Sequence, residues 1–76
     1  MPIVTVRVYR SGQPVKGARV ALGADPFDGV YGPQYTDYHG VAQFVVKHGQ
    51  GGDVFVNGPA VDKWGSSSRT DVTVNL

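Results

Sequence analysis

The stretch TDYHGVAQFVV, residues 36 to 46, decides the fold prediction because it joins a tight turn to a strand. Asp37 and Gly40 are turn residues, since an aspartate carboxylate hydrogen-bonds the backbone two residues on and glycine adopts the left-handed conformation that closes a turn. The segment after the turn carries apolar side chains at every second position, which is the period of a half-buried β-strand. The stretch is therefore interpreted mainly as a turn that aims a strand, with Tyr38 and His39 exposed at its tip.

The same alternation appears on both sides of this stretch. Further strands are predicted at residues 3–10 (IVTVRVYR), 18–22 (ARVAL), 53–57 (DVFVN) and 69–76 (RTDVTVNL). Two weaker strands are predicted, one within VYGPQYT (30–36), at a sheet edge where proline is tolerated, and one at 60–63. The predicted core contains the inward-facing residues of the stronger strands: Val4, Val6, Val8, Val20, Leu22, Ala42, Phe44, Val46, Val54, Val56, Val72 and Val74.

The composition agrees with short strands joined by turns. All six acidic residues are aspartates, which favour turns over helices, and the chain has 11 glycines and 5 prolines. A chain of 76 residues forms one domain, and a domain of this size buries only about 60% of its unfolded surface. It contains no cysteine, so neither a disulfide nor thiolate chemistry is available. Turn signals at this spacing predict an all-β sandwich or barrel that spans residues 1–76.

Charge and hydropathy exclude two classes of partner. The formal net charge is +1, and the basic residues are spread along the chain and do not form the cluster that nucleic acid requires. No apolar stretch approaches the roughly 18 residues of a membrane span. The N-terminal MPIVTVRVYR does not resemble a signal peptide. Cytoplasmic localisation is expected for a full-length chain, and an extracellular or periplasmic one for a domain of a larger secreted protein.

Four segments of the sequence resemble a known domain family in the order in which they occur. They are GQPVKGARV (12–20), TDYHGVAQF (36–44), VFVNG (54–58) and the closing VTVNL (72–76). This pattern resembles the carboxypeptidase regulatory-like and prealbumin-like domains, an immunoglobulin-like group. The resemblance implies a Greek-key β-sandwich that serves as an accessory module of enzymes, adhesins or outer-membrane proteins. The fold prediction is thus a single small immunoglobulin-like Greek-key β-sandwich of six to seven strands.

The candidates for metal binding or catalysis show no pattern typical of such sites. His39, His48, Asp25, Asp28 and Asp37 lack the spacing of metal ligands, and the DPFDG segment lacks the alternating oxygen ligands of a calcium loop. The serines lie in predicted loops without a histidine nearby in the sequence, whereas a nucleophile needs an adjacent base. Neither a metal, nor a cofactor, nor an enzymatic activity is predicted.

The aromatic residues outside the predicted core form the candidate ligand or partner surface. This candidate surface consists of Tyr31, Tyr35, Tyr38, His39 and Trp64, with Phe27 as a further aromatic residue of a loop. One interpretation places Trp64 over the open end of the sandwich as part of the core. The other assembles the tyrosines and Trp64 into a flat platform that stacks on a sugar ring or a partner protein.

The functional prediction is a non-catalytic structural or protein-interaction module, and the alternative is a small carbohydrate-binding module that uses the loop aromatics. The expected partner is another protein or a parent polypeptide, or a glycan in the alternative. Weak self-association through the edge strands is also considered, because unpaired strand edges are templates for further pairing.

Overall fold

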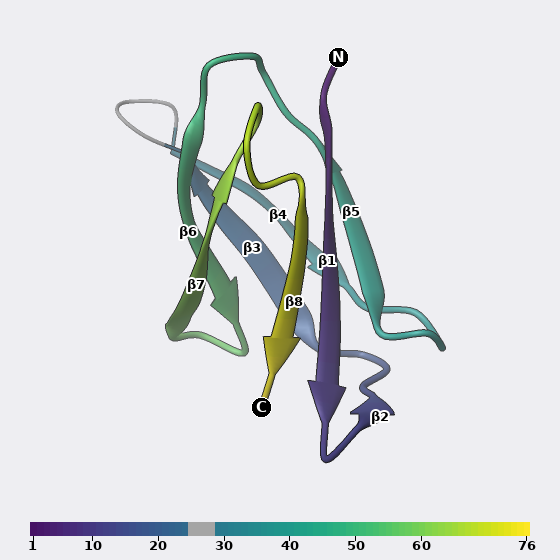
Figure 1. Ribbon diagram of the computed structural model, residues 1–76. Helices are drawn as coiled ribbons and strands as arrows, with labels where there is room; N and C mark the ends of the chain where they lie inside the picture. Colours follow the sequence, from purple (N-terminus) through teal and green to yellow (C-terminus); the bar gives the residue numbers. More distant parts are fainter. Residues whose placement is uncertain (25–28) are drawn as a thin grey trace.

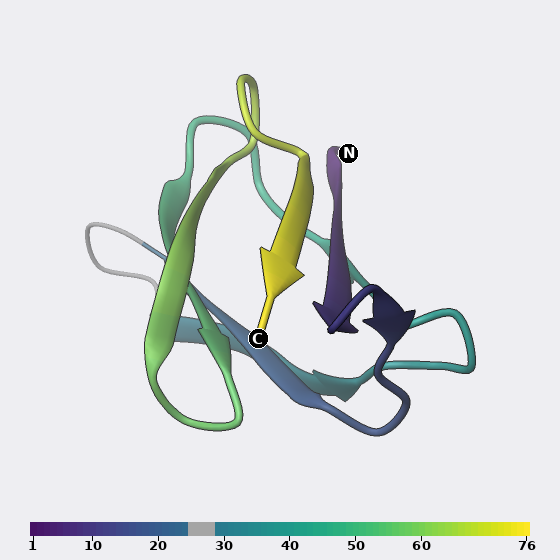
Figure 2. The ribbon, with the colours of Figure 1, turned by 60° about the horizontal axis from the view of Figure 1, so that its bottom comes forward.

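A computed structural model of the chain describes residues 1–24 and 29–76 and is built from strands, without a helix in these two ranges (Figure 1). The eight strands are β1 (Ile3–Arg10), β2 (Gln13–Pro14), β3 (Arg19–Ala24), β4 (Gly29–Tyr35), β5 (Val41–Val45), β6 (Gly51–Val56), β7 (Ala60–Gly65) and β8 (Asp71–Asn75). They form two sheets that pack face to face, as two views of the ribbon show (Figures 1 and 2). The predicted all-β sandwich is confirmed.

The first sheet, called sheet A, is organised around β1. Strand β5 pairs with β1 antiparallel on one side, from Ile3 opposite Val45 to Arg7 opposite Val41. Strand β8 pairs with β1 parallel on the other side, so the first and last strands of the chain are neighbours. The short β2 continues from β1 through a hairpin and adds only two residue pairs. Sheet A is therefore mixed, with its N-terminal strand in the middle.

The second sheet, called sheet B, is antiparallel and has the order β4-β3-β6-β7. Strands β3 and β6 lie in its centre, where Val20 is opposite Val56 and Leu22 is opposite Val54. The register of β3 with β4 shifts between Val20 and Leu22, and that of β6 with β7 shifts after Val54. Irregular pairing is thus confined to the two outer strands of this sheet.

The core lies between the two sheets and contains all the residues that the alternation predicts, because successive side chains of a strand point to opposite faces. Phe44 of β5 is only 4% exposed, and valines from β1, β3, β6 and β8 surround the same space. Ala18, Ala24 and Trp64 also belong to this core. Every predicted core position is therefore confirmed as buried.

The structure differs from the strand prediction mainly in length and number. The weak strand predicted at 60–63 is a full strand, Ala60–Gly65, and the edge strand near 30–36 runs from Gly29 to Tyr35. Residues 13 and 14, which lie outside the predicted strands, form a two-residue strand beyond the tight turn at Ser11 and Gly12, both of which have positive φ. A turn of this kind brings the following residues back beside β1, which explains the additional strand.

Replacement of Phe44 tests the importance of the core. Phe44→Ala is expected to lower the free energy of unfolding by about 3–5 kcal/mol, because it removes a buried ring and leaves a cavity. Denaturant titration measures this loss. The neighbouring Val45 is 55% exposed, so Val45→Ala serves as the control and should cost under about 1 kcal/mol. A loss below about 1 kcal/mol for Phe44→Ala would contradict its central place in the core.

Candidate functional site

The stretch 36–40 is a turn whose geometry comes from Asp37 and Gly40. The Asp37 carboxylate accepts hydrogen bonds from the backbone N–H groups of His39 (2.8 Å) and Val41 (3.1 Å). Gly40 has a φ of +76°, and a Cβ atom at this position would lie 2.5 Å from the carbonyl oxygen of Val8. Only glycine fits so close to β1. The predicted turn is confirmed, with the side chains of Tyr38 and His39 exposed to solvent.

Thr36 ties this turn to the loop between β2 and β3, and the two loops lie side by side at one end of the sandwich (Figure 2). Its hydroxyl donates to the carbonyl oxygen of Val15 and accepts from the N–H of Ala18 (2.9 Å). Its backbone bonds to Gly17 (2.9 Å) and Ala18 (3.0 Å) in addition. Thr36 is only 4% exposed, so these bonds satisfy polar groups that water does not reach. Nothing in the sequence indicates this role except that a threonine precedes a turn.

Substitution of Thr36 by a residue of the same shape tests this connection. Thr36→Val leaves the N–H of Ala18 and the carbonyl of Val15 without their side-chain partner, and each such loss costs about 1–3 kcal/mol. Thr36→Ser keeps the hydroxyl and serves as the matched control. Thermal and denaturant unfolding should therefore show a much larger loss of stability for Thr36→Val than for Thr36→Ser. Equal losses for the two variants would indicate that the hydroxyl contributes no more to stability than the methyl group.

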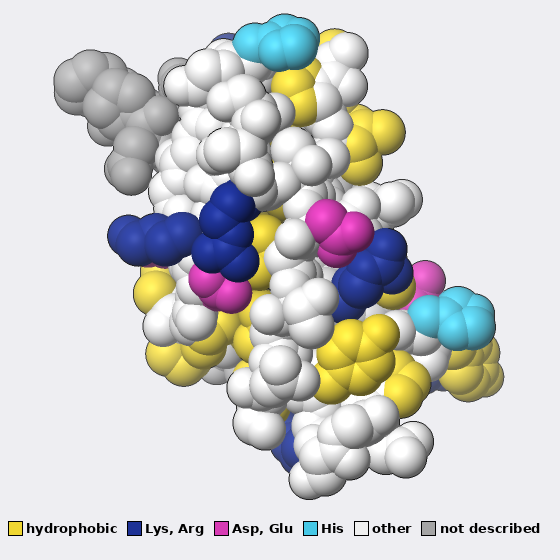
Figure 3. Space-filling model, in the orientation of Figure 1, with side chains coloured by type: hydrophobic (Ala, Val, Ile, Leu, Met, Phe, Trp, Pro, Cys, Tyr) yellow, Lys and Arg dark blue, Asp and Glu magenta, His cyan; other side chains and the backbone are white. Residues whose placement is uncertain are grey.

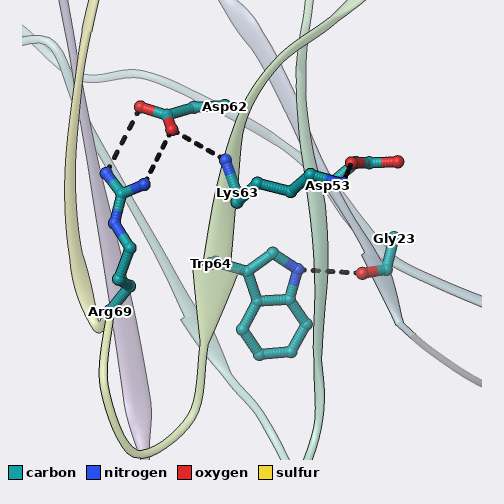
Figure 4. Close-up of polar contacts among 6 residues, drawn as sticks. All are labelled: Gly23, Asp53, Asp62, Lys63, Trp64 and Arg69. Carbon is teal, nitrogen blue, oxygen red and sulfur yellow. Dashed lines mark hydrogen bonds and ion pairs between the residues drawn. The ribbon is translucent and has the colours of Figure 1, made fainter.

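Two aromatic residues of the candidate surface lie inside the fold. Trp64 is 4% exposed, and its indole Nε1–H donates to the carbonyl oxygen of Gly23 at 2.8 Å (Figure 4). The partly buried Tyr31 packs against the core and meets Trp64 edge to face, with ring centroids 6.0 Å apart. Its hydroxyl donates to the side chain of Gln50 and accepts from the N–H of Lys47. Both rings are therefore part of the packing, as the first interpretation of Trp64 expects.

The other three residues of the candidate surface are exposed. Tyr38 is 75% exposed, and the ammonium group of Lys16 lies 4.0 Å from the centre of its ring. Tyr35 is 63% exposed and is opposite Arg19 in sheet B. His39 projects from the turn. A platform of four exposed rings is not formed, because two of the rings are internal and Lys16 covers part of a third.

A charged cluster closes the gap between the sheets at β7 and β8. The guanidinium of Arg69 donates to both carboxylate oxygens of Asp62, at 2.9 and 3.4 Å, and the backbone N–H of Lys63 donates to the same carboxylate at 2.8 Å (Figure 4). Mutual backbone bonds between Gly65 and Arg69 hold the segment before β8 against β7. Trp64 lies beside this cluster in the close-up (Figure 4), so the cluster borders the core.

Two carboxyl groups of the structure have lowered pKa values. The N–H of Lys63 and then the guanidinium of Arg69 lower the pKa of Asp62 below its usual 3.8. Hydrogen bonds from the N–H groups of Val41 and His39, in that order, lower the pKa of Asp37. A depressed pKa in the folded state means that the ionised carboxylate stabilises the fold above pH 3.8 and that this contribution is lost on acidification through the lower, folded-state pKa.

Acid unfolding tests the contribution of Asp62. The wild-type chain is expected to lose stability as the pH falls below 3.8, and Asp62→Asn should lose less over that range because its side chain does not titrate. At neutral pH the same variant should be less stable by at most about 1 kcal/mol, since the pair with Arg69 is partly exposed. Melting temperatures from pH 7 to pH 2 measure both effects. If the melting temperatures of the two proteins fall equally on acidification, the role of Asp62 is contradicted.

No group of three histidine or acidic side chains that could hold a metal ion occurs in residues 1–24 and 29–76. The two histidine side chains lie at separate ends of the face drawn in Figure 3. Asp25, Phe27 and Asp28 lie outside the described residues. Within the described ranges the structure contains neither a pocket nor a helix long and apolar enough to cross a bilayer.

The outer faces of the two sheets differ in chemical character. On sheet A, Arg7 donates to Asp71 (3.2 Å) and Gln43 donates to Thr5 (3.3 Å), so polar groups occupy its middle. Figure 3 shows basic side chains in contact with acidic ones on this side, and uncharged surface lies between these pairs. On sheet B, Phe55 is directly opposite Ala21 on one side and Ala60 on the other. The middle of sheet B is thus apolar on the side that faces solvent.

Comparison of the chain with protein-family models, with curated proteins and with solved structures gives no match.

Proposed function

We propose that the protein is a non-catalytic protein-interaction module whose contact surface is the outer face of sheet B. The observation that carries this proposal is a group of apolar residues around Phe55 on the outer side of the sheet, most of them exposed or partly exposed, with Ala21 buried among them. We call it the Phe55 face, and it consists of Ala21, Val30, Tyr35, Phe55 and Ala60. Apolar groups that share one exposed face usually mark a contact with another molecule.

Cross-strand register supports placing these residues on one surface. Directly opposed residues of an antiparallel pair point to the same face, and Phe55 is opposed to Ala21 and Ala60. The Phe55 ring lies over Gly23, where a Cβ atom would come within 3.0 Å of it, and Gly23 is opposite Val30. The apolar surface therefore extends across all four strands of the sheet. Val30 and Tyr35 are more than 60% exposed.

Charged residues border this apolar surface. The Lys63 ammonium contacts the Asp53 carboxylate at 2.7 Å, and Asp53 lies two residues before Phe55 on β6, opposite Lys63 of β7. Arg19 lies beside Tyr35 at the other end of the face. An apolar centre within a charged and polar rim is the usual anatomy of a protein–protein interface. A protein partner is favoured over a glycan, because the rings of Tyr31 and Trp64 pack in or against the core and are not available to stack on a sugar.

We further propose that the domain belongs to the immunoglobulin-like sandwiches that the sequence resembles, the carboxypeptidase regulatory-like and prealbumin-like domains. The turn residues of that pattern support this assignment, since Gly12 and Gly17 both have a φ of +78° and the turn at Asp37 and Gly40 leads into β5. Such domains serve as accessory modules, which agrees with an interaction role. A shared fold does not by itself establish a function, so the Phe55 face carries the functional proposal.

Capture of partners from the native source tests the proposal. The tagged domain is crosslinked in extracts, and the captured proteins are quantified for the wild type, Val30→Asp, Tyr35→Asp and a control, Thr73→Asp. Thr73 is an exposed residue of β8 on the outer face of sheet A. A specific partner should be reduced by about tenfold or more with either sheet B variant and retained with the control, because a buried unpaired charge costs more than about 1.4 kcal/mol.

Melting curves of the variants must show that they are folded. The proposal is wrong if the three substitutions have the same effect on capture, or if the pure domain turns over a substrate. A glycan-array signal that Tyr35→Ala and Tyr38→Ala abolish without loss of stability would support the carbohydrate-binding alternative.

A further inference from the structure

Within the part of the chain that the structure describes, strand β5 has a free edge on which two of its residues offer unpaired backbone groups. In the β1–β5 ladder, Val8 donates to Gly40 (2.8 Å) and Val46 donates to Pro2 (3.0 Å), so the even-numbered residues of this segment bond to β1. In an antiparallel pair the residues between them direct their N–H and C=O groups to the other side. Among the described residues no strand pairs with that side of β5.

The two ends of this edge are already occupied. At one end, both backbone groups of Val41 bond to Asp37, its N–H to the carboxylate and its C=O to the backbone N–H of that residue. At the other end, the N–H of Lys47 donates to the hydroxyl of Tyr31 at 3.1 Å. The free donors and acceptors are therefore the N–H and C=O groups of Gln43 and Val45, two of each kind.

The β5 edge also lacks the features that protect other edges. Proteins protect exposed edges with prolines, bulges and charged side chains. Strand β4 contains Pro33 after Gly32, β7 carries Lys63 and an irregular register, and β8 presents Asp71. Residues 41–45 (VAQFV) contain neither proline, nor glycine, nor a charge, and their pairing with β1 has no bulge. The exposed side chain of Val45 lies directly beside that of Ile3, also exposed.

We propose that two copies of the chain associate through antiparallel pairing of their β5 strands about a two-fold axis at Phe44. Gln43 of each copy is then opposite Val45 of the other, and the four free groups of one edge meet the four of the second in four hydrogen bonds. The segment is self-complementary, because its free groups are symmetric about Phe44. This makes a second copy the occupant that satisfies the edge completely.

Charge complementarity in this register supports the second copy. Beyond the paired residues 43 to 45, the Lys47 end of one copy comes next to the Asp37 turn of the other, because that turn occupies the edge at Val41. The exposed Lys47 ammonium and the Asp37 carboxylate of the other copy therefore approach each other twice in the dimer. No like charges are opposed, since residues 41–45 carry none. Edge-to-edge contact of this length buries less than the roughly 1,000 Å² of a stable interface, so the dimer is weak and depends on concentration.

Disulfide trapping tests the register directly, because the 76-residue sequence contains no cysteine. Directly opposed Cα atoms of a hydrogen-bonded pair are about 5.5 Å apart, which a disulfide spans, whereas residues offset by two positions are about 8–9 Å apart, beyond its reach of about 7 Å. A mixture of the Gln43→Cys and Val45→Cys proteins should therefore crosslink under mild oxidation, at least about fivefold more than either protein alone. Thr73→Cys, at the free edge of β8, is the matched control and should not crosslink.

Sedimentation of the unmodified chain provides an independent measurement. The average mass of the wild type should rise with chain concentration between about 10 µM and 1 mM, the range that reveals a Kd near 0.1 mM. Val45→Lys should remain monomeric because it places a charge at the edge, and Thr73→Lys should behave as the wild type. A wild type that is monomeric throughout overturns the proposal, as does equal crosslinking in the mixture and the single proteins, or crosslinking of Thr73→Cys. The Phe55 face does not take part in this dimer. Val30→Asp should therefore leave dimerisation unchanged, whether or not the Phe55 face binds a partner protein.

Discussion

The whole sandwich depends on β1, because its backbone groups are divided between two neighbours. Its even-numbered residues bond to β5, as the bonds of Pro2 and Val8 at the ends of the ladder indicate, and its odd-numbered residues bond to β8, beginning with Thr5 and Thr70 (2.7 Å). The same parity that turns Val4, Val6 and Val8 into the core also fixes both registers. A slip of one residue would expose these valines and break both ladders. The first strand therefore determines the position of the last one, 60 or more residues later in the chain.

The parts of the fold that were predictable from the sequence are those that depend on local rules. Alternation with a period of two identified the core, since burial of one face of a strand needs no knowledge of its partners. The turn at Asp37 and Gly40 was predictable because an aspartate bonds to its own nearby backbone. Strand β7 was underestimated because its DKW segment does not alternate: Asp62 points into the gap between the sheets, where Arg69 neutralises it.

The candidate site was less predictable, because exposure depends on contacts between segments that are distant in the sequence. Tyr31 and Trp64 were grouped with Tyr35 and Tyr38 as aromatics of loops, yet the acceptor of the Trp64 indole is Gly23, 41 residues away. Phe55 alternates with the core residues Val54 and Val56, which predicts only that it faces outward. Its significance follows from register, which places Ala21 and Ala60 beside it and leaves Gly23 beneath its ring. A single sequence contains no signal for such a cross-strand surface.

The two gaps between the sheets are closed by different means, and this difference explains why the edges are unequal. At β7 and β8 the closure is polar, through Arg69, Asp62 and the backbone bonds of Gly65. Charged groups there also protect the nearby edges from further pairing. At β4 and β5 the closure is apolar: the Phe44 ring lies against Gly32, where a Cβ atom would come within 3.0 Å of it. Apolar closure places no charge within β5, so among the described residues the outward backbone groups of Gln43 and Val45 have neither a partner strand nor a charged neighbour in their own strand. In a domain without a disulfide, the residues that best seal the core at this gap are thus the ones that leave an edge open to pairing.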